Sequence, residues 1–346
     1  MEKHPPQMEK ILIVQTAFLG DVILTTPLIR AVKQFYPESF VSFLLIPETR
    51  EVVANNPWLD QVLVYDKRRK HKALGKFLSL LREIRENTFE SALIPHRSLR
   101  SALLPYLARI PHRIGFDRSA GSFLLTRKVK YQKSRHEIER NLSLLSNFKD
   151  KKDFLPELFP SPDDFAIVDN FLKDNKLNVD EIMVGIAPGS VWLTKRWLPE
   201  RFAQVADQLT KELKAKVVLV GSKEDENLCY YISNLMEQNP VIAAGKMSFL
   251  QSAALISKCV VILSNDSAPV HMAAAMRTPV VEIYGSTVPE FGFAPLGEGN
   301  VIIQKALYCR PCGIHGKNTC PEKHFRCMTE ITTDEVFEAI MTILKR

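Results

Sequence analysis

The stretch that decides the fold is VILSNDSAPVHMAAA, residues 261–275. The apolar run Val260–Leu263 is followed by the polar residues 264–266, and Pro269 stands where the first turn of a helix would be. This order predicts a strand, a tight turn and a helix N-terminus. Such a turn directs backbone N–H groups and the positive end of a helix dipole at one point, which suits a phosphate. The alternative is that Asp266 and Ser267 only cap the helix.

The same alternation of short apolar runs and amphipathic segments continues on both sides of this stretch. In the second half we predict strands at 182–187, 216–220, 241–244, 260–263 and 279–284, and helices at 199–213, 224–236, 249–257 and 269–276. In the first half we predict strands at 10–15, 40–46, 61–65, 91–94 and 113–116, and helices at 21–36, 49–55, 73–86, 99–108 and 136–148. The alternation predicts an α/β protein whose parallel sheets are covered by helices on both faces.

A charged run at 149–153 and three prolines, Pro156, Pro160 and Pro162, predict the linker between two domains. We expect a first domain at 9–155, a second at 156–330, and a C-terminal helix at 331–346 able to cross back to the first domain. Two tandem α/β domains predict a ligand between them, at the carboxyl ends of their strands. No G-x-G-x-x-G follows any strand, which disfavours an NAD-dependent oxidoreductase.

Charge is distributed unevenly along the 346 residues. Residues 1–150 hold 25 Lys and Arg against 15 Asp and Glu, a net of +10, and residues 151–346 hold 21 against 24, a net of −3. The positive charge of the first half therefore predicts an anionic partner, although the basic run 67–72 could also be an ordinary solvent-exposed surface. Nucleic acid is disfavoured because the basic clusters have neither interleaved aromatic residues nor a recognisable reading motif.

No apolar run reaches the roughly 18 residues of a membrane span. The polar opening MEKHPPQM, residues 1–8, has no hydrophobic region of a signal peptide. We therefore expect a cytoplasmic protein.

Candidate functional residues follow the predicted strands. Asp21 follows strand 10–15 and opens a helix, whose dipole should keep the carboxylate ionised and able to accept a proton; an ordinary helix-start acid is the alternative. In the loop PGSVWLTKRW, residues 188–197, the polar side chains of Ser190, Thr194 and Lys195 could bind a diphosphate. The loop is not a P-loop, and a plain connection is the alternative.

Two further positions suit the rest of a nucleotide. Asp225 follows another predicted strand, where a carboxylate can accept hydrogen bonds from ribose hydroxyls. Met247 could pack on a base, although a methionine in such a place is also an ordinary core residue.

Four of the six cysteines lie within 19 residues, as Cys309-x2-Cys312-x7-Cys320-x6-Cys327. In a reducing compartment this density favours a metal site over disulfides. Only the first pair has metal-ligand spacing, so zinc, an iron–sulfur cluster and free thiols all stay open.

Five motifs together resemble the bacterial heptosyltransferases of glycosyltransferase family 9. They appear in the family's order and cover the chain from about Lys10 to the last helix. The lysine loop and the cysteine-rich segment look most like the heptosyltransferase II branch. The motifs are FLGDVILTTP (18–27), HEIERN (136–141), KRW (195–197), SNDSAPVH (264–271) and the cysteine-rich segment.

The resemblance implies a GT-B fold of two Rossmann-like domains, with the donor held mainly by the second and the acceptor by the first. It implies ADP-heptose as donor and the heptosylated Kdo region of lipid A as acceptor. The resemblance assigns Asp21 as general base and Lys195 as the diphosphate-binding lysine. The other residues that it assigns to the donor are Asp225 (ribose), Met247 (adenine), and Asp266, Ser267, Ala268 and His271 (phosphate and sugar). The resemblance also assigns Ser190 and Thr194, in the loop that carries Lys195, to the donor. His136 and Arg140 match positions near the acceptor's acidic sugars, and the basic Arg97 and Arg100 are grouped with them.

The expected reaction is an inverting displacement of ADP by an acceptor hydroxyl, with Asp21 as base and Lys195 opposite the leaving diphosphate. We expect no cofactor and no divalent metal, and peripheral contact with the cytoplasmic face of the inner membrane. The alternatives are a heptosyltransferase I or another family 9 enzyme and, in another class, a non-catalytic nucleotide-sugar-binding protein.

Overall fold

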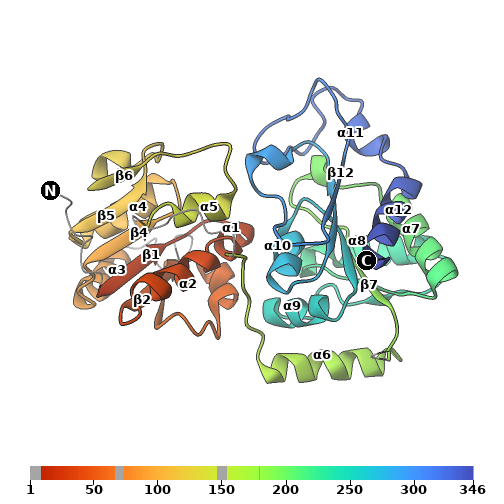
Figure 1. The fold of residues 1–346 in the computed structure, drawn as a ribbon, viewed down its shortest axis with the longest axis horizontal. Coiled ribbons are helices and arrows are strands. Elements are labelled where there is room, and N and C mark those ends of the chain that lie inside the picture. Colours follow the sequence, from red (N-terminus) through yellow and green to blue (C-terminus); the bar gives the residue numbers. More distant parts are fainter. Residues whose placement is uncertain (1–8, 67–73, 146–153, 179, 346) are drawn as a thin grey trace. The chain divides into compact units, whose positions relative to one another are not determined.

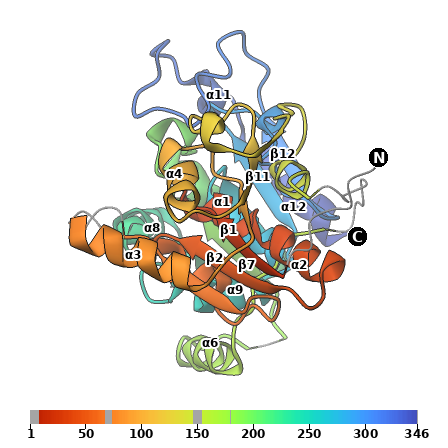
Figure 2. The same cartoon turned by 90° about the vertical axis from the view of Figure 1, so that its left-hand side faces the viewer.

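The structure is a computed structural model that describes residues 9–66, 74–145, 154–178 and 180–345. The chain divides into two compact units, Met1–Phe159 and Pro160–Arg346. Each unit contains one six-stranded parallel sheet with helices on both faces (Figure 1, Figure 2). The leader at 1–8, the basic run 67–72 and the charged run 149–153 lie outside the described residues.

The first sheet has the strand order β3-β2-β1-β4-β5-β6. Leu12 and Val14 of β1 pack against the core that α3 and α4 cover, and α2 packs with α5. The strands are β1 (Lys10–Val14), β2 (Phe40–Leu45), β3 (Gln61–Val64), β4 (Ser91–Ile94), β5 (His112–Phe116) and β6 (Arg127–Val129). The helices are α1 (Leu19–Ile23), α2 (Thr26–Phe35), α3 (Leu74–Glu86), α4 (Leu99–Leu107) and α5 (Glu137–Leu142), with 3-10 turns η1 (Pro47–Val53) and η3 (Ser122–Leu124).

The second sheet has the order β12-β11-β10-β7-β8-β9. Helices α8 and α12 both pack on α7, while α9 contacts both α6 and α10. The strands are β7 (Met183–Ala187), β8 (Lys216–Leu219), β9 (Val241–Ile242), β10 (Val261–Asn265), β11 (Val280–Tyr284) and β12 (Val301–Gln304). The helices are α6 (Pro162–Asp174), α7 (Pro199–Leu213), α8 (Glu226–Leu235), α9 (Phe249–Ser257), α10 (Ala268–Ala275), α11 (Arg326–Thr329) and α12 (Thr333–Leu344), with 3-10 turns η4 (Leu193–Lys195), η5 (Lys223–Asp225) and η6 (Pro289–Phe291).

The two sheets repeat one topology. In each, the first strand lies centrally, the next two add to one side, and the chain then crosses to the other side. The direction changes between β1 and β4 in the first unit and between β7 and β10 in the second. Open α/β sheets bind ligands outside the carboxyl ends of the strands at such a switch point. The loops after β1, β4, β7 and β10 are therefore the expected ligand-binding loops.

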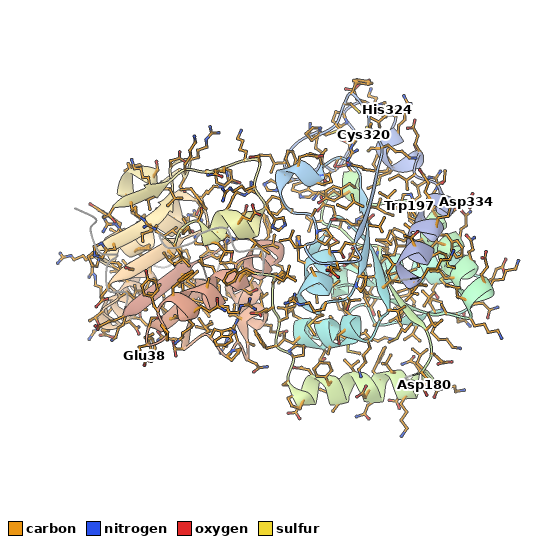
Figure 3. The ribbon with its side chains drawn as sticks, viewed as in Figure 1. Glu38, Asp180, Trp197, Cys320, His324 and Asp334 are labelled. Carbon is orange, nitrogen blue, oxygen red and sulfur yellow. The ribbon has the colours of Figure 1, made fainter. Side chains whose placement is uncertain are left out.

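Trp197 anchors the core of the second unit (Figure 3). Its side chain is 1% exposed, its ring meets Phe202 edge to face at 5.0 Å, and its indole N–H donates to the carbonyl of Ile331 at 3.2 Å. Helix α12, which follows Ile331, packs on α7 and on strands β10 to β12. The terminal helix was predicted at 331–346 as able to cross back to the first domain; in the structure α12 packs on elements of the second unit.

The predicted fold class is confirmed, and several element boundaries are wrong. The helix predicted at 21–36 is divided at Leu24 and Thr25, and the one at 49–55 is a 3-10 turn. Pro162, taken as linker, is the first residue of α6, whose N-terminus is closed by a Ser161–Asp164 capping box. Strands β6 and β12 were missed because β6 has three residues and β12 alternates between partly buried and exposed side chains. Within the described ranges, no helix has the length and apolar character required to span a bilayer.

Candidate active site

An ion pair occupies the switch point of the second sheet. Lys195, in the loop after β7, places Nζ 2.6 Å from Oδ2 of Asp266, directly after β10, and both side chains are largely buried. The Thr287 hydroxyl donates to the same carboxylate oxygen at 2.5 Å. Ser267 stands at the N-cap position of α10 but its side chain makes no capping hydrogen bond. The carboxylate of Asp266 is thus committed to Lys195 and Thr287, which argues against the simple helix-cap interpretation.

Buried hydrogen bonds hold the lysine loop in place. The Asn265 amide donates to the carbonyl of Pro188 at 2.8 Å and accepts from the backbone N–H of Trp197 at 2.9 Å, so one side chain joins both ends of the loop. The hydroxyl of Thr194 lies 2.9 Å from that of Ser286. Ser190, also buried, has its carbonyl bonded by the Arg196 side chain at 2.7 Å. Thr194 and Ser190 therefore shape the loop that presents Lys195.

Asp225 lies against the start of the same loop. Its Oδ2 accepts from the backbone N–H and the hydroxyl of Ser222 at 3.0 and 2.8 Å, which closes the turn after β8. Its Oδ1 is so near Gly189 that a Cβ on that glycine would lie 2.1 Å away. Asp225 is thus both a capping residue and a carboxylate beside the diphosphate-binding candidates.

Met247 is partly exposed in the turn between β9 and α9. Because β10, β7, β8 and β9 are consecutive neighbours, the candidates form a row along one edge of the sheet. The Lys195–Asp266 pair comes first, then Asp225, then Met247. Adjacent strands lie roughly 4.8 Å apart, so the row spans on the order of 10–15 Å. That span suits a nucleoside diphosphate lying across the strand ends.

Ala268 is partly exposed in the first turn of α10, and His271, one turn later, is buried.

In the first unit, Asp21 lies on α1 just after β1, at the other switch point. Burial, and next the charge of Glu137, raise its pKa to about 7, against the lowering effects of backbone hydrogen bonds and of Arg97. The helix N-terminus was expected to keep Asp21 ionised, but burial outweighs it. A carboxyl with this pKa can both hold and accept a proton near neutrality.

Two guanidinium groups share one aromatic ring near Asp21. Arg97, just after β4, lies 4.2 Å from the ring centre of Tyr131, and Arg140 lies 4.9 Å from the same centre. Glu137, whose side chain is buried, places Oε2 2.8 Å from Nε of Arg140. Burial raises the pKa of Glu137, while Arg140 and Arg97 lower it. The cluster thus brings two cations and two carboxyl groups together at one end of the sheet.

The motif HEIERN supports this cluster structurally. His136 is the N-cap of α5, and its Nδ1 accepts from the N–H of Ile138 at 3.2 Å. Asn141, fully buried, donates to the carbonyl of Leu24 at 3.1 Å, beside the break between α1 and α2. Of the predicted acceptor residues, Arg97 and Arg140 meet at Tyr131, His136 lies at the start of the same helix as Arg140, and Arg100 is exposed on α4. Tyr131, Glu137, Asn141, Asn265 and Thr287 were not predicted as site residues.

The cysteine-rich segment is a long loop on the second unit that ends in α11, where Cys327 is buried; Figure 3 labels Cys320 and His324. The Cys309 thiol lies 3.7 Å from Nε2 of His324, and the Cys312 thiol donates to the carbonyl of Cys309 at 3.3 Å. All six cysteines are free thiols. No group of three or more His, Cys, Asp or Glu side chains in the described ranges is arranged to hold a metal. Metal analysis of protein purified anaerobically distinguishes the three states left open by the spacing.

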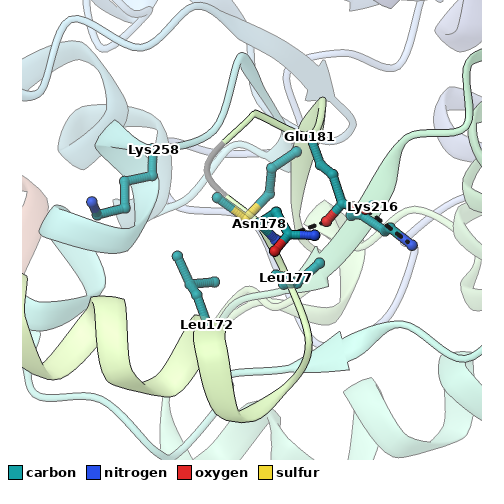
Figure 4. Close-up of a pocket in the computed structure, with 7 residues that line it drawn as sticks. Leu172, Leu177, Asn178, Glu181, Lys216 and Lys258 are labelled. Atoms are coloured by element: carbon teal, nitrogen blue, oxygen red, sulfur yellow. Dashed lines mark hydrogen bonds and ion pairs between the residues drawn. The ribbon is translucent and has the colours of Figure 1, made fainter.

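A small pocket lies at the opposite edge of the second sheet, near the amino ends of β7 and β8 (Figure 4). Glu181 and Lys216 form an ion pair there at 3.5 Å. Ligands bind at the carboxyl ends of such strands, so this pocket is not part of the candidate site. Its lining residues are Leu172, Leu177, Asn178, Glu181, Met183, Lys216 and Lys258.

Comparison with known proteins gives consistent matches over the whole chain. The model of glycosyltransferase family 9 (heptosyltransferase) matches residues 77–325. The lipopolysaccharide heptosyltransferase 2 of Salmonella typhimurium is 26% identical, with 97% of this chain and 98% of that protein covered. The solved family 9 glycosyl transferase from Veillonella parvula superposes with a TM-score of 0.89 at 23% identity, covering 99% of each chain. The E. coli ADP-heptose LPS heptosyltransferase II does so with a TM-score of 0.79 at 25% identity, covering 97% of this chain and 98% of that one.

Proposed function

This chain belongs to glycosyltransferase family 9, and we propose that it is a heptosyltransferase II, which moves heptose from ADP-L-glycero-β-D-manno-heptose to the heptosyl-Kdo inner core of lipopolysaccharide. The observation that carries the proposal is the row of the Lys195–Asp266 pair, Asp225 and Met247 along the strand ends. The Lys195–Asp266 pair, Asp225 and Met247 follow one another in the order of the diphosphate, the ribose and the base of a nucleotide. Full-length similarity to the Salmonella and E. coli enzymes supports the choice of donor and acceptor.

Asp21 is the proposed base. With a pKa raised to about 7, it is a stronger base than an ordinary carboxylate and is still largely ionised slightly above neutrality. It would take the proton of the acceptor hydroxyl as that oxygen attacks the anomeric carbon. One displacement of this kind inverts the anomeric centre.

Lys195 is the proposed partner of the leaving group. As the bond to ADP breaks, negative charge grows on the diphosphate, and an ammonium group held in a largely buried position stabilises it more strongly than one in water. The N–H groups at Ser267 and Ala268 are proposed to add to this stabilisation. Positive charge from the chain itself is thus available to the leaving diphosphate.

The acceptor is proposed to lie against the first unit. Arg97 and Arg140, which share the Tyr131 ring, offer two cations to the acidic sugars, and the net charge of +10 over residues 1–150 favours an anionic lipid. We place the reaction at the cytoplasmic face of the inner membrane, with peripheral contact only.

The test is transfer to defined acceptors. Purified protein is incubated with ADP-heptose and with lipid A–Kdo acceptors carrying either no heptose or one, while ADP release and product mass are followed. Gain of one heptose by the acceptor that already carries one supports the proposal. Preference for the heptose-free acceptor would instead identify a heptosyltransferase I, and ADP binding without any transfer would identify a binding protein.

A further inference from the structure

Glu282 is a carboxyl group enclosed in the middle of the second sheet. It is the central residue of β11 and is 0% exposed. Its strand neighbours Val281 and Ile283 point into the core under α7 and α12, so Glu282 points to the other face. In the described part of the chain neither of its carboxylate oxygens has a hydrogen-bond partner. The Tyr284 hydroxyl, two residues on, interacts with it without reaching hydrogen-bond geometry. An ionised carboxylate in such a place is strongly disfavoured.

The strand register puts this carboxyl group next to the donor site. Glu282 is in register with Ser264 of β10, and the N–H of Asp266 donates to the carbonyl of Ile283 at 3.1 Å. Asp266 lies two residues after Ser264 and so on the same face of the sheet as Glu282. Burial, together with the negative charge of Asp266, raises the pKa of Glu282 well above its ordinary value, while Lys195 lowers it. Burial first, and then the charges of Glu282, Asp266 and Glu290, raise the pKa of Tyr284.

These contacts define the charge balance of the site. Lys195 carries one positive charge, Asp266 carries one negative charge at 2.6 Å, and Glu282 adds nothing while it is protonated. A diphosphate must compete with Asp266 for Lys195. Once Glu282 has lost its proton, the diphosphate must compete with two carboxylates and is repelled by both.

We propose that Glu282 is a positioning residue of the donor site, whose neutral carboxyl group leaves Asp266 as the single counter-charge of Lys195 and whose ionisation weakens binding of an anionic diphosphate. This inference rests on the proposed function only for the nature of the ligand. Glu282 exchanges no proton on binding while it is protonated. At a pH at which Glu282 is ionised, tight binding of ADP requires the Glu282 carboxylate to take up one proton from solvent.

The test is the pH dependence of ADP binding to wild-type protein, Glu282→Gln and Glu282→Met, measured by titration calorimetry between about pH 6.5 and about pH 9. Glutamine keeps the shape of a neutral carboxyl group and cannot ionise. If the Glu282→Gln protein does not fold, Glu282→Met provides a second variant that cannot ionise. Because burial and the charge of Asp266 raise the pKa of Glu282, we expect the ratio of wild-type to variant Kd to rise toward the alkaline end of this range. Measurements in buffers of different ionisation enthalpy should show proton uptake for wild type at the alkaline end and less for either variant.

Glu181→Gln is the matched control, because Glu181 pairs with Lys216 at the other edge of the same sheet. Its Kd should follow wild type at every pH. A wild-type to variant ratio that stays constant across the range overturns the role of Glu282, whatever its effect on stability. Absence of ADP binding to wild-type protein at all pH values overturns the proposed function instead, so the two failures are distinguishable.

Discussion

The side-chain carbonyl of Asn265 accepts the backbone N–H of Trp197 at 2.9 Å, and both side chains are almost completely buried. Through its amide group Asn265 also holds the carbonyl of Pro188, so strand β10 fixes the loop that carries Lys195. The two halves of the proposed diphosphate site are therefore connected by one side chain.

Asn265→Ala should lower both stability and donor affinity. The change leaves a buried N–H and a buried carbonyl without partners, and we expect a loss of about 2–4 kcal/mol in the free energy of unfolding. Denaturant unfolding measures this loss, and calorimetry should show weaker ADP binding. Asn300→Ala, on a loop beside β11, is a control for amide loss away from Lys195. Unchanged ADP affinity in a folded Asn265→Ala protein would contradict the positioning role.

Asp21→Asn should abolish transfer and leave ADP affinity nearly unchanged, because the amide cannot accept the proton. In wild-type protein the pKa of about 7 predicts that kcat/KM falls about tenfold for each pH unit below about pH 7. The direction follows from the base being needed in its ionised form. Asp60 pairs with Lys33 at 2.7 Å elsewhere in the same unit, and Asp60→Asn serves as control for the loss of an acid. Transfer by Asp21→Asn within about tenfold of wild type would remove Asp21 from the role of base.

Glu137→Gln and Arg97→Ala should move the acid limb of the pH profile in opposite directions. The charge of Glu137 raises the pKa of Asp21 and that of Arg97 lowers it. We expect the limb to shift to lower pH in Glu137→Gln and to higher pH in Arg97→Ala, each by roughly half a unit to one unit. Profiles of kcat/KM measure the position of the limb separately from any loss of acceptor affinity. Shifts in the same direction for both variants would contradict this electrostatic account.

Lys195→Ala should raise the Kd for ADP by about ten- to a hundredfold, because one charge-assisted contact to the diphosphate is lost. Lys216→Ala removes a lysine of the same unit from the opposite sheet edge and should bind ADP normally. Adenosine is a second control, since it has no diphosphate and should bind both proteins alike. An unchanged Kd for ADP in Lys195→Ala would exclude this lysine from the phosphate site.

The periodic elements of the chain were predictable, and its tertiary relationships were not. Helices α7 and α9 match the predicted bounds because their apolar spacing is regular and their ends carry Pro199 and a Ser248 cap. The break after α1 was not predictable, because the helical pattern of apolar residues continues through 21–36. At the break, the Thr25 hydroxyl donates to the carbonyl of Asp21.

For the site, motif order placed Asp21, Lys195 and Asp266 at the ends of strands. It gave no sign that Glu137 raises the pKa of Asp21, because residue 137 is 116 positions away in the chain. Glu282 was equally hidden within the apolar strand VVEIY, where only the register with β10 shows that it lies beside Asp266. Long-range charge pairs of this kind have no local pattern from which to predict them.

The repeated strand order has a consequence for specificity. Every residue proposed to contact the donor lies within Pro160–Arg346, and every residue proposed to contact the acceptor lies within Met1–Phe159. Each unit has its own sheet and its own core, so the proposed donor and acceptor sites lie on separate compact units. Donor and acceptor preference can therefore change independently, and a chimera that joins the first unit of one relative to the second unit of another should inherit one substrate from each parent.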